Sequence, residues 1–97
     1  MTRWFHPAFE TDLIVAAKYL GEQRAGFDGA FLDEVEKAVE IIAQSPSVWR
    51  PLHKDIRRFL LPRFQYTIRY RIRADEDRIE FLSVTHAARH PCSDLDR

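Results

Sequence analysis

The sequence predicts an α+β domain, with an N-terminal strand followed by an antiparallel helical hairpin packed on a three- to four-stranded antiparallel sheet. Two segments, 7–22 and 27–45, carry apolar residues at helical spacing and are joined by a short connection. The stretch QYTIRYRIR, residues 65–73, alternates apolar and polar residues without a lapse, as a half-buried strand does. Two further strand-like segments, 56–61 and 78–86, lie on either side of it along the chain, so the three form a meander.

The N-terminal strand and the first helix follow from the opening residues. The segment TRWFH, residues 2–6, is short and aromatic and is expected at an edge of the sheet. Pro7 suits the first turn of a helix, because its missing N–H would have no partner there. Glu10 and Asp12 place negative charge near the positive end of the helix dipole. The apolar residues that follow recur at helical spacing: Phe9, Leu13, Ala16, Ala17 and Leu20.

The second helix runs from about Phe27 to Ser45, and Pro46 stops it. Its apolar positions also recur at helical spacing: Phe31, Leu32, Val35, Ala38, Val39 and Ile42. Because Gly21 and Gly26 bracket only a short connection, the two helices should form an antiparallel hairpin. The apolar stripe of that hairpin must be covered by the sheet.

The remaining segments make the sheet. Residues 45–55 form a loop with two prolines and an aromatic anchor, Trp49. Pro62 separates the strand at 56–61 from the strand at 64–73. The polar turn ADED then leads into the last strand. The strand at 64–73 directs its apolar residues toward the helices and leaves three arginines on the open face: Arg69, Arg71 and Arg73.

The charges are unevenly distributed, although the formal net charge is zero. Residues 50–73 hold eight basic residues against one acidic residue. Residues 1–49 hold four against eight, and residues 74–97 hold three against six. This asymmetry suggests a polyanionic partner for the basic segment. A solvated sheet face is the alternative interpretation.

Length and composition indicate one soluble globular domain over residues 1–97, with an irregular tail at 91–97. No stretch is long and apolar enough for a membrane helix, and the charged N-terminus is unlike a secretory signal. A single cysteine, Cys92, fits a reducing cytoplasm, where we expect the protein to be.

The sequence offers few candidates for chemistry. The four histidines are scattered, there is no paired-cysteine motif and no glycine-rich phosphate loop, so we expect no metal and no cofactor. A metal-independent ribonuclease could use arginines to stabilise a charged transition state and a histidine to move the proton. The candidates for those roles are Arg57, Arg58, His86 and Arg89.

Four stretches in this order resemble the RelE/ParE superfamily of type II toxin–antitoxin toxins: FHPAFETDLIVAAKYL, FLDEVEKAVEIIAQSP, IRRFLLPRFQYTIRYRI and FLSVTHAARHP. The resemblance implies a toxin that a cognate antitoxin neutralises within a hetero-oligomer. In the family the antitoxin often places a helix against the helical hairpin and a strand on the sheet edge. The residues expected to contact it are Leu13, Ala17, Leu20, Phe31 and Val35.

Two branches of the superfamily imply different targets. RelE-like members cut mRNA in the ribosome and often use a tyrosine in the C-terminal tail, whereas ParE-like members inhibit DNA gyrase. No tyrosine follows Pro91, and PAFETDLIVAAKYL looks more like the ParE and plasmid-stabilisation side. We therefore favour a non-enzymatic gyrase inhibitor over a ribosome-dependent endoribonuclease or a non-toxic nucleic-acid-binding module. The residues expected to contact the target are Arg58, Arg63, Arg69, Arg71, Arg73 and Arg89.

Overall fold

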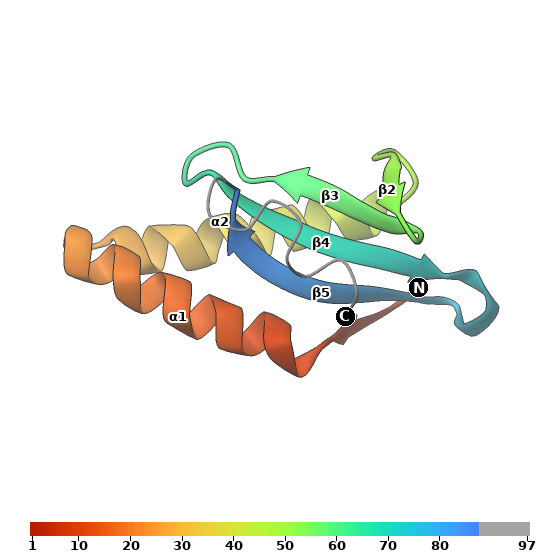
Figure 1. Ribbon diagram of the computed structural model, residues 1–97, viewed down its shortest axis with the longest axis horizontal. Helices are drawn as coiled ribbons and strands as arrows, with labels where there is room; N and C mark the ends of the chain where they lie inside the picture. The colour runs from red at the N-terminus through yellow and green to blue at the C-terminus, as the bar shows by residue number, and fades with distance from the viewer. Residues whose placement is uncertain (88–97) are drawn as a thin grey trace.

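The computed structural model describes residues 1–87, except for the side chains of Leu52 and His53. Its elements are, in chain order, β1 (Thr2–Phe5), α1 (Pro7–Gln23), α2 (Phe27–Gln44), β2 (Pro51–His53), β3 (Ile56–Leu60), β4 (Tyr66–Arg73), a 3₁₀ turn (Ala74–Glu76) and β5 (Arg78–His86). The strands form one sheet in the order β1-β5-β4-β3-β2. Figure 1 shows α1 and α2 as an antiparallel pair packed against this sheet, with α1 next to β5.

The predicted α+β class, the helical hairpin and the β3–β4–β5 meander are confirmed. Two details of the predicted sheet were wrong. Short β2 adds a fifth strand, pairing with β3 where we expected only a loop. β1 pairs with β5 in parallel, from Thr2 opposite Arg78 to Phe5 opposite Phe81, so the sheet is mixed. The partner of an edge strand depends on where the chain returns after the hairpin, and no local pattern encodes that.

Local signals fix the helix ends. Pro7 begins α1, and the imidazole Nδ1 of His6 accepts a hydrogen bond from the N–H of Ala8 at 2.9 Å, which caps the helix. Gly26 precedes α2 with φ of 90°, a left-handed conformation that glycine adopts without strain. α2 ends at Gln44, just before Pro46.

The core lies between the hairpin and the helix-facing side of β4 and β5. Both helices and the two strands β4 and β5 contribute fully buried side chains, among them Phe9, Phe31, Ile42, Ile68, Tyr70, Ile79 and Phe81. Aromatic rings join the layers, since Phe5 stacks on Phe81 with centroids 4.9 Å apart and Phe31 meets Tyr66 at 5.1 Å. The predicted direction of the apolar row in β4 is therefore right.

The alternation in QYTIRYRIR begins one residue outside the strand. Gln65 has φ of 58° and belongs to the preceding turn, whose ends are tied by a hydrogen bond from the N–H of Leu61 to the carbonyl of Tyr66. β5 carries a bulge beside the pair Tyr70–Phe81, where the register with β4 shifts.

Candidate functional site

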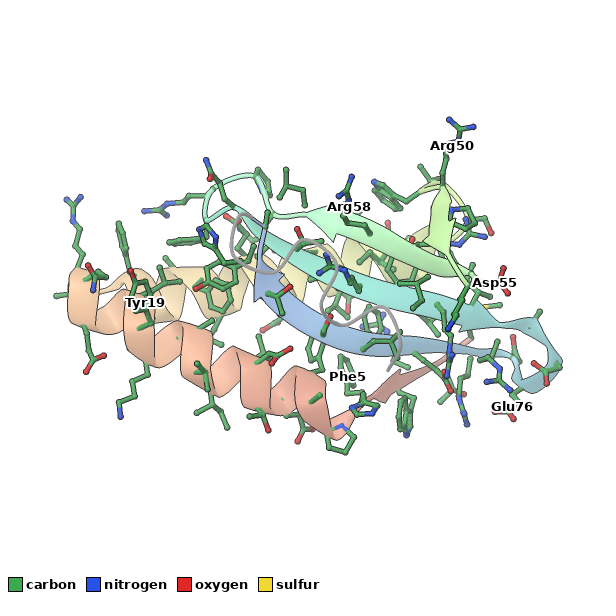
Figure 2. The ribbon with its side chains drawn as sticks, in the orientation of Figure 1. Phe5, Tyr19, Arg50, Asp55, Arg58 and Glu76 are labelled. Atoms are coloured by element: carbon green, nitrogen blue, oxygen red, sulfur yellow. The ribbon has the colours of Figure 1, made fainter. Side chains whose placement is uncertain are left out.

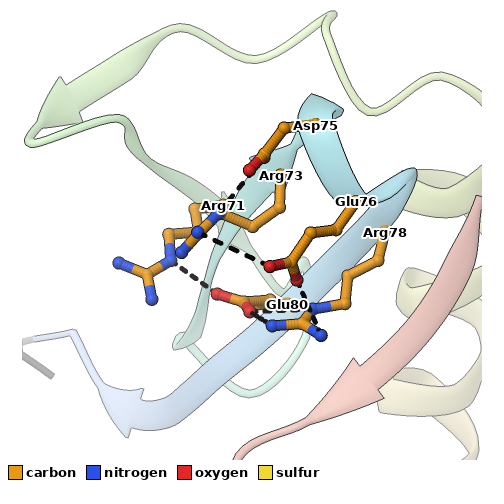
Figure 3. A network of polar contacts seen from close by, with 6 residues as sticks. All are labelled: Arg71, Arg73, Asp75, Glu76, Arg78 and Glu80. Carbon is orange, nitrogen blue, oxygen red and sulfur yellow. Dashed lines mark hydrogen bonds and ion pairs between the residues drawn. The ribbon is translucent and has the colours of Figure 1, made fainter.

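Two arginines of the sheet, Arg71 of β4 and Arg78 of β5, converge on one carboxylate, that of Glu80, near the turn that joins these strands. Glu80 is only 2% exposed. The Nε of Arg71 donates to its Oε1 at 2.6 Å, and the Nε of Arg78 donates to its Oε2 at 2.9 Å (Figure 3). Burial by itself raises the pKa of Glu80, but the hydrogen bonds and charges of Arg71 and Arg78 outweigh it and hold that pKa below its usual value.

The same network extends to the neighbouring turn (Figure 3). Arg78 also forms an ion pair with Glu76, with 2.8 Å between Nη1 and Oε2. The guanidinium of Arg73 lies 3.6 Å from the carboxylate of Asp75 and 3.9 Å from that of Glu76. Three arginines and three carboxylates thus compensate one another. The expected open row of cations is therefore neutralised at this end of the sheet, because the acidic turn folds beside it.

Arg69 was expected to be an exposed contact to a target, but it is buried. It points away from the helices as predicted, but it is 1% exposed, and its Nη1 donates to the Oγ1 of Thr85 at 2.8 Å. β4 is a central strand with β3 and β5 on its two sides, so neighbouring side chains flank Arg69. A target cannot reach this guanidinium without a rearrangement.

Arg57 lies on the helix-facing side and not on the arginine face, since it pairs across strands with Tyr70. Its guanidinium donates to the carbonyls of Trp49 and Ser47 in the loop after α2. The hydroxyl of Tyr70 donates to the carbonyl of Pro46 in the same loop at 2.8 Å. Burial raises the pKa of Tyr70 to about 12, although the charge of Arg57 opposes the shift. Arg57 and Tyr70 thus fix a loop.

Arg58 and Arg63 are exposed, as expected of contacts to a target. Arg58 extends from β3 directly opposite Arg69 (Figure 2). The guanidinium of Arg63 lies over the rings of Phe27 and Phe64, with centroid distances of 5.5 and 5.1 Å. Arg89, a candidate for both catalysis and target binding, lies outside the described residues.

The three candidates for ribonuclease chemistry within residues 1–87 do not come together. His86 pairs with Tyr66 on the helix-facing side, whereas Arg58 is on the opposite face. Arg57 shares the face of His86 but sits opposite Tyr70, four residues further along β4, which is about 13 Å at the rise of a strand. A ribonuclease would need its proton carrier and its charge-stabilising arginine within reach of the same phosphate, and these residues are too far apart for that.

The outer side of the helical hairpin forms an apolar groove. It has a volume of about 510 Å³ and is lined by Glu10, Leu13, Ile14, Ala17 and Leu32. A second hollow adjoins it at Leu13 and Leu32 and reaches Phe5 and Val39. We call this combined feature the hairpin groove. Exposed apolar surface on so small a protein is typical of a binding site for another chain.

The predicted antitoxin contacts divide between this groove and the core. Leu13 and Ala17 line the groove, and Leu20 is half-buried beside the core. Phe31 is fully buried against Phe64 and Tyr66, so it is not a surface residue. Val35 is also a core residue and reaches only the floor of the second hollow. Phe31 and Val35 are therefore core residues, which the sequence did not distinguish from surface residues because the inner and outer sides of one helical stripe look alike.

Sequence reasoning missed Ile14, which is 69% exposed, and Leu32, which is also exposed. The signal was present in LIVAA, residues 13–17, because five successive apolar residues exceed what one buried stripe can use. Within residues 1–87 there is no cluster of histidine, cysteine, aspartate or glutamate that could hold a metal ion. Over the same described part of the chain, no helix is long and apolar enough to span a membrane.

Comparisons with known proteins agree with this architecture. Residues 4–91 match the family model described as the ParE toxin of the type II toxin–antitoxin system parDE. A solved structure, the chromosomal ParDE toxin–antitoxin system from P. aeruginosa, superposes with a TM-score of 0.65 at 17% identity. The match covers 89% of this chain and 95% of that chain. A search of the curated proteins gives no match.

Proposed function

The chain belongs to the ParE toxin family of type II toxin–antitoxin systems, and from this premise we propose that it arrests growth by inhibiting DNA gyrase. We further propose that a cognate antitoxin neutralises it by laying an amphipathic helix in the hairpin groove. Both events would take place in the cytoplasm, and neither requires a cofactor.

The hairpin groove is the observation that carries the antitoxin part of the proposal. Leu13, Ile14, Ala17 and Leu32 offer apolar side chains along two helices, which is the surface that a helix with apolar residues at i, i+3, i+4 and i+7 recognises. Ile14 extends to solvent and has little to contact within its own chain. A partner that covers it gains the burial of a large apolar side chain.

The wide separation of Arg57, Arg58 and His86 favours a binding toxin over a nuclease. Arg57 holds a loop, and no second candidate for charge stabilisation shares the face of His86 within the described residues. Inhibition of gyrase needs a binding surface only. The exposed Arg58 and Arg63 remain the best candidates for that surface.

Gyrase supercoiling with purified components tests the proposal. We expect the wild-type toxin to inhibit supercoiling and the antitoxin to restore it. Ile14→Arg should inhibit as well as the wild type but resist the antitoxin, because the substitution puts a charge into the apolar groove without disturbing the core. Val48→Arg is the matched control, since Val48 is 67% exposed in the loop after α2.

Normal supercoiling at large molar excess of the wild type would refute the gyrase target. Equal antitoxin rescue of Ile14→Arg and Val48→Arg would refute the hairpin groove as the antitoxin site. Cleavage of ribosome-bound mRNA by the wild type would replace the binding mechanism with a nuclease.

A further inference from the structure

The hairpin groove continues along the two helices toward their connection. A third hollow, of about 490 Å³, shares Ala17 and Leu32 with the groove and reaches Gly21 and Gly26. The helices approach closely here, since a Cβ added at Gly21 would lie 3.2 Å from the Cβ of Asp28. We call this third feature the tip hollow. Together with the hairpin groove it follows the antiparallel pair of helices seen in Figure 1.

The length of this surface indicates the length of its partner. Glu40, at one end of the hairpin groove, lies 12 positions after Asp28 in the tip hollow, which is about 18 Å at the rise of a helix. A partner helix of about 12 residues, just over three turns, spans the same distance. Its apolar stripe would cover Ile14 and Leu32, which are both exposed.

Carboxylates predominate along this surface. Among the described residues that line the hairpin groove and the tip hollow, the acidic ones are Glu10, Glu22, Asp28, Glu36 and Glu40. The basic ones are Arg3 and Lys18. All seven are exposed. Because Arg3 pairs with Glu40, the balance among the others is four carboxylates, two on each helix, against Lys18.

An acidic rim beside an apolar floor selects a partner helix by its charge. A lysine or arginine next to the apolar stripe of that helix can lay its stem along the floor and place its charge at the rim. An aspartate or glutamate at the same position would meet the carboxylates of the rim, and like charges across an interface reduce affinity. The apolar floor alone would accept either helix.

We propose that the hairpin groove and the tip hollow together are specific for a basic amphipathic helix, in which lysine or arginine residues flank the apolar stripe on both sides. The inference rests on the proposed function, because the antitoxin is the expected source of that helix. Glu10 of α1 and Glu36 of α2 are the selecting carboxylates at the hairpin groove, where they lie on opposite helices.

Two synthetic helical peptides test this specificity without the antitoxin. They share one apolar stripe and differ only at the flanking positions, which are lysine in one peptide and glutamine in the other. We expect the wild-type toxin to bind the lysine peptide at least about tenfold more tightly in calorimetry at low ionic strength, and added salt to reduce the difference. Equal binding of the two peptides, or binding of neither, would overturn the proposal.

Glu10→Gln with Glu36→Gln is the matched variant, because both side chains are exposed and glutamine keeps their shape. Asp33→Asn with Asp55→Asn is the control, since it changes the net charge equally at exposed positions outside the groove and the tip hollow. We expect the first pair to weaken binding of the lysine peptide by about tenfold and the control pair by less than about twofold. Equal weakening by both pairs would assign the effect to net charge and overturn the role of the rim.

A reversed preference separates charge selection from a loss of folding. Glu10→Lys with Glu36→Lys should bind a third peptide, with glutamate at the flanking positions, more tightly than it binds the lysine peptide. A preference of this variant for the lysine peptide would overturn the assignment of Glu10 and Glu36.

Antitoxin binding then tests the source of the helix. We expect Glu10→Gln with Glu36→Gln to lower the affinity for the antitoxin by about tenfold while inhibition of gyrase is unchanged. An unchanged antitoxin affinity, with the preference for the lysine peptide intact in the wild type, would overturn the antitoxin as the basic partner. Failure of the wild-type toxin to inhibit gyrase is a separate result that refutes the proposed target and leaves the peptide measurements valid.

Discussion

At the residue scale, Glu80 holds the side chains of Arg71 and Arg78 in place. A carboxylate at 2% exposure is stable as an anion only when it is paired, and Arg71 and Arg78 supply the pairing. Both arginines remain about one third exposed, so the pairing stabilises the fold less than a wholly buried pair would. Glu80 thereby fixes two guanidinium groups that would otherwise repel each other.

Replacement of Glu80 by glutamine should remove the charge and keep the shape. The lowered pKa of Glu80 means that its stabilisation is complete above the unfolded value of 4.5 and is lost as pH falls through the lower folded value. At pH 7 we expect Glu80→Gln to reduce the free energy of unfolding by about 1–2 kcal/mol. The difference from the wild type should shrink below about pH 4, as the wild-type carboxylate becomes protonated.

Urea unfolding of both proteins at a series of pH values measures this effect. Glu40→Gln is a useful control, because Glu40 also pairs with an arginine, Arg3, but at the exposed surface. Its loss should change the stability far less. A constant gap between Glu80→Gln and the wild type from pH 7 to pH 3 would contradict the assigned role of the charge.

At the element scale, two glycines at the start of α2, Gly26 and Gly29, have different roles. Gly26 has φ of 90°, so a side chain there is strained even though the space around it is open. Gly29 lies inside the first turns of α2, has an ordinary φ, and a Cβ there would contact nothing within 4 Å. The same substitution should therefore have opposite effects at two positions three residues apart.

We expect Gly26→Ala to lower the free energy of unfolding by about 1 kcal/mol, because alanine does not readily adopt the left-handed conformation. Gly29→Ala should raise it by about 0.5 kcal/mol, since alanine loses less conformational freedom in a helix than glycine does. Thermal and urea unfolding of the two variants provide the measurement. Destabilisation by Gly29→Ala would show that the start of α2 is packed more tightly than its open surroundings indicate.

The elements themselves were largely predictable because their signals are local. Pro7, Pro46 and the apolar spacing gave both helices to within one residue at each end. The parallel pairing of β1 with β5 was not predictable, since it depends on contacts between the two ends of the chain. Alternation in β4 correctly gave the direction of Arg69, but direction does not determine exposure in a central strand.

The candidate site was less predictable than the fold for the same reason. The neutralisation of Arg71 and Arg73 needs Glu80 and the acidic turn at Asp75 and Glu76 to fold beside them. Arg57 was a candidate for ribonuclease chemistry, and its contacts with the carbonyls of the loop after α2 could not be predicted because they depend on tertiary structure. Exposed Ile14, by contrast, was detectable from sequence in the run of apolar residues in α1.

At the scale of the whole molecule, charge separates along the fold although its formal sum is zero. The strand β1 and the hairpin carry an acidic excess, and the segment from Arg50 through β4 carries the basic excess. Pairing with Glu80 and the turn offsets the basic excess at one end of β4. What remains exposed includes Arg50 and Arg58, on the β2–β3 side of the sheet (Figure 2).

This uneven distribution of charge predicts that the position of the basic residues matters more for inhibition of gyrase than the net charge of the protein does. Arg50→Glu with Arg58→Glu changes the net charge by −4, and so does Lys18→Glu with Lys37→Glu on the exposed sides of the helices. We expect the first pair to raise the toxin concentration needed for half-inhibition of supercoiling by at least about tenfold, and the second to change it less than about twofold. The Arg58 substitution should not unfold the sheet, because it replaces a like charge opposite Arg69 with an opposite charge. Equal loss in both double variants would assign the effect to net charge, and full inhibition by the Arg50 and Arg58 variant would exclude this side of the sheet from the gyrase contact.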